Sequence, residues 1–263
     1  MYKGLVLDID NTIVRERKNK ITDEDLSSIK YLNEIGVPII LATGRTHTNA
    51  QIIAEKIGLN NPIISSYGAM IRSSTSKNDL IYKKYNMEPE DVLTLMDIIN
   101  STPFVCGYIV TTNGTLFVSN CASNVKDIFR PFINYNTFLR NNLLYSVLQI
   151  TIYNLDKNLK YHDRIYNLIQ GSVKAKVTKK TRVIVLHSHK TNKGIALDEL
   201  CTLRNWNIKE FIAIGDNEFD IPMFEKAAIS IGFEKVYPYV DKKIKKENKR
   251  AIAECIEKYF IAK

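Results

Sequence analysis

The chain has 263 residues, of which 45% are hydrophobic and 25% charged, with 11 glycines and 7 prolines. This composition excludes a collagen-like, low-complexity or wholly disordered chain and suffices for one large or two modest domains. Lys and Arg exceed Asp and Glu by 37 to 28, a net charge of +9 at pH 7 that raises nucleic acid or anionic small molecules as partners. The excess is spread along the chain without an RNA-binding signature, so we do not expect a nucleic acid partner.

Nothing in the sequence indicates a membrane segment or a secreted chain. No stretch approaches the ~20 apolar residues that cross a bilayer, and the N-terminus reaches Asp8 too early for a signal peptide. The four cysteines are scattered and form no CxxC pair. We therefore expect a cytoplasmic protein with reduced thiols, no membrane partner, and a monomeric or homodimeric state.

The first part of the chain alternates strands and helices. Thr22 is a candidate N-cap, and Gly36 and Gly58 are candidate helix ends. The apolar runs predict strands over 4–9, 37–42 and 62–65, alternating with helices over 23–35 and 46–57. Such alternation is typical of a parallel sheet covered by helices on both faces.

The pattern changes after residue 72. Asn113-Gly114 is a strong hairpin signal. We predict helices over 88–100, 122–133 and 157–169, strands over 104–111, 115–119 and 147–153, and two more strands that meet near residues 179–180. These elements form helix–strand–strand units, which favours an inserted α+β domain over residues 73–181.

Strand–helix alternation resumes at residue 182. Strands are predicted over 183–186, 211–215 and 228–231, with helices over 193–203 and 219–227. The predicted fold class is therefore α/β, with a core domain of residues 1–72 and 182–263 interrupted by the insertion.

Two carboxylates follow the first predicted strand. Asp8 and Asp10 are one residue apart, so a turn could direct both towards one substrate. One carboxylate could attack a phosphorus atom while the other exchanges a proton with the leaving oxygen. Taken alone, this segment favours a turn rich in Asp and Asn that satisfies its own backbone.

Three further segments lie where strands end or helices begin. Thr43-Gly44-Arg45 follows the second strand, where its hydroxyl and N–H groups could hold an anion, and Lys193 opens a helix. Asp216, Asn217 and Asp220 follow another strand, and with Asp8 they form an oxygen-rich set that suits Mg²⁺. Each segment has an ordinary structural explanation by itself. Ligands of open α/β sheets bind beyond the carboxyl ends of strands, so the coincidence of four such segments favours a functional site.

The ordered motifs resemble a known family. Asp8-x-Asp10-x-Thr12, Thr43, Lys193 and Gly215-Asp216-x-x-x-Asp220 are similar to the four motifs of the haloacid dehalogenase (HAD) superfamily of phosphotransferases. The insertion resembles the cap of the Cof-type, sucrose-phosphatase-like branch (HAD subfamily IIB), which includes archaeal phosphoglycolate phosphatases. The resemblance covers essentially the whole chain and implies a HAD-like Rossmannoid three-layer core with an α+β cap that determines substrate specificity.

The resemblance also implies catalytic roles. Asp8 would be the nucleophile that forms an aspartyl-phosphate, and Asp10 would protonate the leaving group and then activate water. The residues that would bind the phosphoryl group are Thr12, Thr43, Gly44, Arg45, Lys193 and Asn217. The residues that would bind Mg²⁺ are Asp8, Asp10 through its backbone carbonyl, and Asp216, with Asp220 in support.

The expected function is a Mg²⁺-dependent phosphatase of small phosphorylated metabolites such as sugar phosphates or phosphoglycolate. Three positions depart from the family pattern: Asn11 stands where Gly is frequent, and Tyr67 and Phe219 stand where Asn is usual. Two alternatives remain open. The chain could be a phosphomutase of the same fold, or a non-catalytic HAD-like binding protein in which the two aromatic residues close the pocket.

Overall fold

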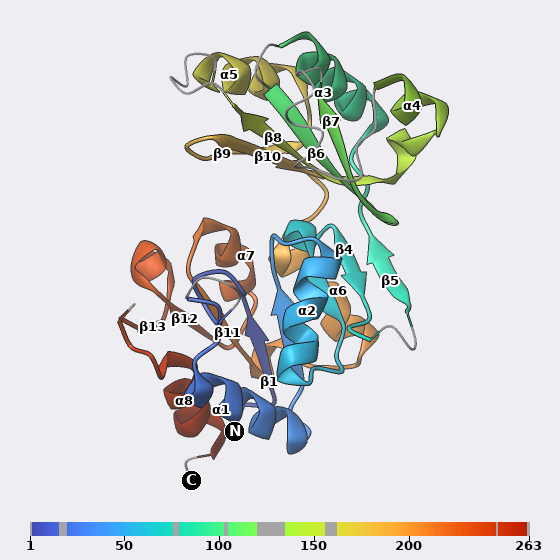
Figure 1. Cartoon of the computed structure of the whole chain (residues 1–263). Helices are drawn as coiled ribbons and strands as arrows, with labels where there is room; N and C mark the ends of the chain where they lie inside the picture. The colour runs from blue at the N-terminus through green and yellow to red at the C-terminus, as the bar shows by residue number, and fades with distance from the viewer. Residues whose placement is uncertain are drawn as a thin grey trace. The chain divides into compact units, whose positions relative to one another are not determined.

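A computed structural model describes residues 2–15, 20–75, 79–102, 105–119, 135–155, 162–245 and 247–261 (Figure 1). The chain forms two compact units, one of Met1–Lys83 with Thr191–Lys263 and the other of Lys84–Lys190. The helix predicted over 122–133 lies outside the described residues. Within the described part of the chain, no helix is both long and apolar enough to cross a membrane.

The first unit is built on an eight-stranded sheet. Its strands are β1 (Gly4–Leu7), β2 (Ile39–Ala42), β3 (Ile63–Ser65), β4 (Met70–Arg72), β5 (Ile81–Lys84), β11 (Phe211–Gly215), β12 (Ile229–Gly232) and β13 (Lys242–Lys243). They lie in the order β13-β12-β11-β1-β2-β3-β4-β5. Neighbours from β13 to β3 run parallel, whereas β3 and β4 run antiparallel. Because β1 pairs with both β2 and β11, the carboxyl ends of β1 and β11 are adjacent.

Helices cover both faces of this sheet. They are α1 (Asp23–Glu34), α2 (His47–Ile57), α6 (Lys193–Leu203), α7 (Ile221–Phe224) and α8 (Ala251–Ile256). Apolar residues of α1, α2 and α8 pack on one face, and those of α6 and α7 pack on the other (Figure 1). The strands between these layers are apolar and buried throughout, which is typical of a parallel sheet covered on both sides. The predicted three-layer core is thus present.

The second unit is an antiparallel sheet with helices on one face. Its elements are α3 (Pro89–Ser101), β6 (Val105–Thr111), β7 (Gly114–Ser119), α4 (Tyr135–Arg140), β8 (Val147–Asn154), α5 (His162–Ser172), β9 (Lys176–Lys179) and β10 (Val183–His187). The strand order is β7-β6-β8-β10-β9, with antiparallel neighbours throughout. Apolar residues of α3 and α5 pack with alternate residues of β6, β8 and β10, as expected for a half-covered sheet.

One predicted strand belongs to the other unit. The strand expected in the core over 183–186 is β10, which pairs with β8 and β9 in the second sheet, so that assignment was wrong. An apolar run of this length does not specify which sheet it joins. The sheet is set by the tight connection from β9, which is closed by a 2.7 Å hydrogen bond from the Lys180 N–H to the Val183 carbonyl. The units accordingly change at Lys83/Lys84 and Lys190/Thr191, later at both ends than the predicted limits of 73–181.

Candidate active site

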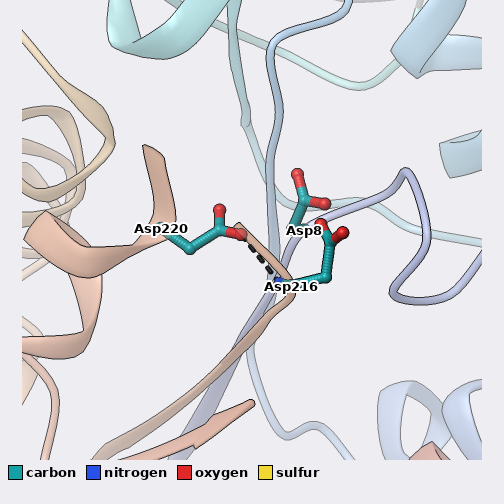
Figure 2. A group of neighbouring side chains, drawn as sticks. All are labelled: Asp8, Asp216 and Asp220. Carbon is teal, nitrogen blue, oxygen red and sulfur yellow. Dashed lines mark hydrogen bonds between the residues drawn. The ribbon is translucent and has the colours of Figure 1, made fainter. Parts of the chain in front are cut away.

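Three buried carboxylates gather at the carboxyl ends of β1 and β11 (Figure 2). Asp8 directly follows β1, Asp216 directly follows β11, and Asp220 ends the short 3-10 turn Glu218–Asp220. One oxygen from each lies within 4.8 Å of the others. The residues are only 2%, 5% and 0% exposed, respectively. Because buried like charges repel, this arrangement requires positive charge nearby.

Lys193 provides the positive charge within the protein. It opens α6 and is 2% exposed, and its Nζ donates to Asp8 Oδ1 and to Asp220 Oδ1 at 2.5 Å each. Burial alone would lower the pKa of Lys193, but the carboxylates of Asp220 and Asp8 outweigh that effect and raise it. The ammonium therefore remains charged and bridges the first strand to the loop after β11.

The surroundings of Asp8 leave its charge incompletely compensated. Burial raises the pKa of Asp8; the ammonium of Lys193 opposes this rise, and the charges of Asp220 and Asp216 add to it. Its other oxygen accepts a long hydrogen bond, 3.4 Å, from the Thr12 hydroxyl. A further cation next to Asp8 and Asp216 would stabilise both carboxylates in their ionised form.

The loop after β11 is held in shape by its own side chains. Asp220 Oδ2 accepts the N–H groups of Asp216 and Asn217 at 2.9 and 3.1 Å, the first of which is drawn in Figure 2. Asn217 Oδ1 accepts the N–H of Phe219 at 3.0 Å, while its Nδ2 donates to Asp216 Oδ1 at 2.7 Å. Gly215 is required here, because a Cβ at that position would lie 2.5 Å from Asp220 Cγ.

These contacts indicate which carboxylates could hold a metal ion. Asp220 accepts three hydrogen bonds, at 2.5, 2.9 and 3.1 Å, so this residue supports the loop and the lysine. Asp8 accepts one short bond from Lys193 and one long bond from Thr12. Asp8 and Asp216 are the carboxylates with remaining acceptor capacity on adjacent strand ends. Oxygen donors of this kind fit a hard divalent cation such as Mg²⁺.

The segment Thr43-Gly44-Arg45 follows β2 on the same edge of the sheet. Thr43 is fully buried, and its Oγ1 accepts the N–H of Arg45 at 3.1 Å. The Thr43 carbonyl accepts the N–H of Tyr67 at 3.0 Å, and the Arg45 carbonyl accepts the N–H of Ser66 at 2.8 Å. Because Thr43 Oγ1 accepts from the backbone, its hydroxyl proton can be donated to an anion.

Asp10 differs from the other site carboxylates in being exposed. Its side chain is 53% exposed and forms a bidentate pair with Arg45, from Nε to Oδ2 at 3.0 Å and from Nη2 to Oδ1 at 2.6 Å. Such a forked pair fixes the orientation of the carboxylate. Asp10 therefore lies at the solvent side of the site, whereas Asp8 lies in its floor.

The structure brings most of the predicted site residues into two hydrogen-bonded groups. Asp8, Thr12, Lys193, Asp216, Asn217 and Asp220 form one hydrogen-bonded network, while Asp10 is joined to Arg45. Asn192 was not predicted as a site residue. It caps α6 by accepting the Ile195 N–H at 2.8 Å and so fixes the start of the helix that carries Lys193. An Asn directly before a predicted helix is an N-cap signal that would have identified it.

Comparison with known proteins identifies the family. Residues 5–256 match the haloacid dehalogenase-like hydrolases, and the chain belongs to this family. It is similar to a phosphoglycolate phosphatase of Methanosarcina acetivorans, 25% identical over 88% of this chain and 82% of the relative. A putative phosphatase of Haemophilus influenzae is 26% identical over 86% of this chain and 83% of that protein.

A solved structure of a HAD subclass IIB sugar phosphatase superimposes with a TM-score of 0.79, at 18% identity, over 98% of this chain and 99% of that one. The predicted HAD-like fold and the resemblance to archaeal phosphoglycolate phosphatases are therefore confirmed, as is the expectation of a hydrolase.

Proposed function

We propose that the protein is a Mg²⁺-dependent phosphomonoesterase that acts on small phosphorylated metabolites such as sugar phosphates or phosphoglycolate. The observation that carries this proposal is the buried carboxylate of Asp8 at the end of β1, 2.5 Å from the fixed ammonium of Lys193. A carboxylate nucleophile beside a fixed positive charge suits attack on an anionic phosphoryl group. The similarity to proteins named phosphoglycolate phosphatase and sugar phosphatase supports this substrate class.

In the first step, an Asp8 carboxylate oxygen forms a bond to phosphorus as the bond from phosphorus to the ester oxygen breaks. Asp10 donates a proton to the departing oxygen, so the alcohol leaves neutral and the phosphoryl group stays on Asp8. Lys193 and the Thr43 hydroxyl stabilise the phosphoryl oxygens, and their burial strengthens that interaction. The other predicted phosphate-binding residues are Thr12, Gly44, Arg45 and Asn217.

In the second step, water attacks phosphorus and Asp10 accepts its proton. The bond between phosphorus and the Asp8 oxygen breaks, which restores the carboxylate and releases inorganic phosphate. The exposure of Asp10 gives it access to both the leaving group and water, and the Arg45 fork keeps its carboxylate oriented in both steps.

Mg²⁺, when bound, would neutralise charge on the transferring phosphoryl group. Asp8, Asp216 and the backbone carbonyl of Asp10 are the groups that would hold it, with Asp220 supporting the Asp216 loop. We assign substrate selection to the second unit, the predicted cap.

The test is phosphate release from p-nitrophenyl phosphate and from a panel of phosphorylated sugars, acids and nucleotides, with Mg²⁺ or with EDTA. The wild type should release phosphate only with the metal, and Asp8→Asn should lower kcat by at least about 10³-fold because an amide cannot form the acyl-phosphate. Asp23→Asn, an exposed change on α1, is the control and should keep full activity.

Three outcomes would contradict the proposal. An Asp8→Asn variant as active as the wild type would remove the nucleophile. A phosphorylated isomer in place of inorganic phosphate would indicate the phosphomutase alternative. A folded wild type with no turnover on any compound would favour the binding-protein alternative.

A further inference from the structure

A left-handed turn follows β3 at the edge of the site. Ser66, Tyr67 and Gly68 have φ values of 49°, 59° and 97°. Only glycine adopts this region freely, and each of the other two residues costs on the order of 1 kcal/mol there. Two successive strained residues persist only where the surroundings impose them, and such strain concentrates at functional sites.

The surroundings of this turn fix it from two sides. Hydrogen bonds from the Ser66 and Tyr67 N–H groups tie it to the Thr43-Gly44-Arg45 segment, at 2.8 and 3.0 Å. On the other side, the Thr191 hydroxyl donates to the Gly68 carbonyl at 3.0 Å, and a Cβ on Gly68 would overlap the backbone oxygen of Asn192. The turn is thus clamped between the predicted phosphate-binding segment and the start of α6.

The clamped turn directs the Tyr67 ring across Gly44. A Cβ built on Gly44 would lie 2.7 Å from the Tyr67 hydroxyl oxygen, so the hydroxyl end of the ring rests on the Gly44 backbone. Tyr67 also packs against Phe219, with ring centroids 4.6 Å apart and planes inclined by 51°. Both residues are half-buried. The phenol is therefore held between the segment after β2 and the loop that carries Asp216 and Asp220.

The phenol retains its proton in this position. Burial raises the pKa of Tyr67 to about 12; the charge of Lys193 lowers it, and the charges of Asp8, Asp10 and Asp220 add to the rise. At neutral pH the hydroxyl, which lies over Gly44 of the predicted phosphate-binding segment, is therefore a hydrogen-bond donor. A phosphoryl oxygen is a strong acceptor for such a donor.

We propose that Tyr67 is a further phosphate-binding residue, whose hydroxyl donates a hydrogen bond to a phosphoryl oxygen of the substrate and of inorganic phosphate. Phe219 is a positioning residue that acts through Tyr67 by holding its ring over Gly44. This proposal deepens the proposed function and rests on it. It differs from the alternative in which the two rings close the pocket.

The test uses Tyr67→Phe, which removes the hydroxyl and keeps the ring. We would measure the Kd of orthophosphate by calorimetry in the Mg²⁺-loaded protein, together with KM and kcat for p-nitrophenyl phosphate. A hydrogen bond to a charged acceptor predicts a rise of about tenfold or more in Kd and KM. Tyr31→Phe, on the exposed surface of α1, is the matched control and should change neither constant.

A second variant tests the same idea without touching the hydroxyl. Phe219→Leu removes the ring that supports Tyr67, and loss of one aromatic contact predicts a rise of about threefold in KM. A merely structural role would instead lower the unfolding temperature and leave KM and Kd unchanged.

The outcomes separate this proposal from the function on which it rests. Metal-dependent hydrolysis by the wild type with unchanged constants in Tyr67→Phe would overturn the Tyr67 proposal alone. A wild type that neither binds orthophosphate nor hydrolyses any phosphomonoester would overturn both. Orthophosphate binding that weakens in Tyr67→Phe, in a protein with no turnover, would support Tyr67 and contradict the catalytic proposal.

Discussion

Asp8 and Asp25 are two buried carboxylates of the same unit with different surroundings. Asp25 is fully buried; its Oδ1 accepts the N–H groups of Ile252 and Ala253 at 3.1 and 2.9 Å, and its Oδ2 pairs with Arg15. Asp8 is 2% exposed, and among the described residues its carboxylate accepts hydrogen bonds from the side chains of Lys193 and Thr12 alone. Burial raises the pKa of both carboxyl groups.

The difference lies in the donors. Asp25 bonds backbone groups at the start of α8 and so joins the first helix of the chain to its last turns, a structural role. Asp8 shares one ammonium with Asp220 and has Asp216 as a third carboxylate nearby, so its charge is not fully compensated by the protein. Burial is therefore common to both carboxylates, whereas incomplete compensation of the charge distinguishes Asp8, the proposed nucleophile.

Replacing the cation that pairs with each carboxylate should separate the two most strongly. Lys193→Met should lower kcat/KM by about 10²- to 10³-fold, because it removes the fixed charge beside the phosphoryl site. Arg15→Met should leave the activity of the folded protein within about twofold, because the contacts described for Arg15 are with Asp25, two backbone carbonyls and the Phe233 ring, not with a proposed site residue. Steady-state kinetics on folded samples would measure both. Equal losses in the two variants would break the distinction between the two carboxylates.

Stability should show the opposite order. Asp25→Ala should lower the free energy of unfolding by about 3 kcal/mol, since it leaves buried N–H groups and a buried guanidinium without their acceptor. Asp8→Asn, in the absence of metal, should cost less than about 1 kcal/mol, because it removes one of three neighbouring carboxylates. Urea unfolding of each variant with EDTA measures the two values. A greater loss for Asp8→Asn would mean that Asp8 is mainly structural.

The comparison also predicts a pH dependence of the metal-free stability. In the metal-free folded protein, burial raises the pKa of Asp8 from the ordinary value of 3.8 to about 8, so the folded protein keeps this proton at pH values where the unfolded chain has lost it. Between these values unfolding releases a proton, so metal-free stability falls as pH rises. The free energy of unfolding of Asp8→Asn, relative to that of the wild type, should therefore rise from pH 4 to pH 8 and then level off. Urea unfolding at a series of pH values would test this, and a difference independent of pH would contradict it.

The strands and the helix that carry the site residues could be predicted from short-range sequence patterns. The strands before Asp8, Thr43 and Asp216, and the helix opened by Lys193, could be predicted because apolar runs and helix ends are short-range patterns. Their meeting at one sheet edge followed from the parallel topology. The strand at β10 was placed in the wrong sheet because the choice of pairing partner is a tertiary property.

Side-chain pairs between segments that are far apart in the sequence could not be predicted. The Arg45 fork on Asp10 depends on how two loops face each other, and the Asp25 clamp joins residues separated by 227 positions. Tyr67 departs from the family pattern, but its placement over Gly44 could not be predicted. That placement depends on a left-handed turn, which Ser and Tyr do not favour.

The most direct test of the account is to locate the phosphoryl group during turnover. Radiolabelled phosphomonoester would be mixed with Mg²⁺-loaded enzyme and quenched in acid within the first turnover, and the labelled peptide sequenced. We predict a hydroxylamine-labile phosphoryl group on Asp8, absent from Asp8→Asn. Label on another residue, or turnover with no label on the protein at any quench time, would contradict the assignment of Asp8 as the nucleophile.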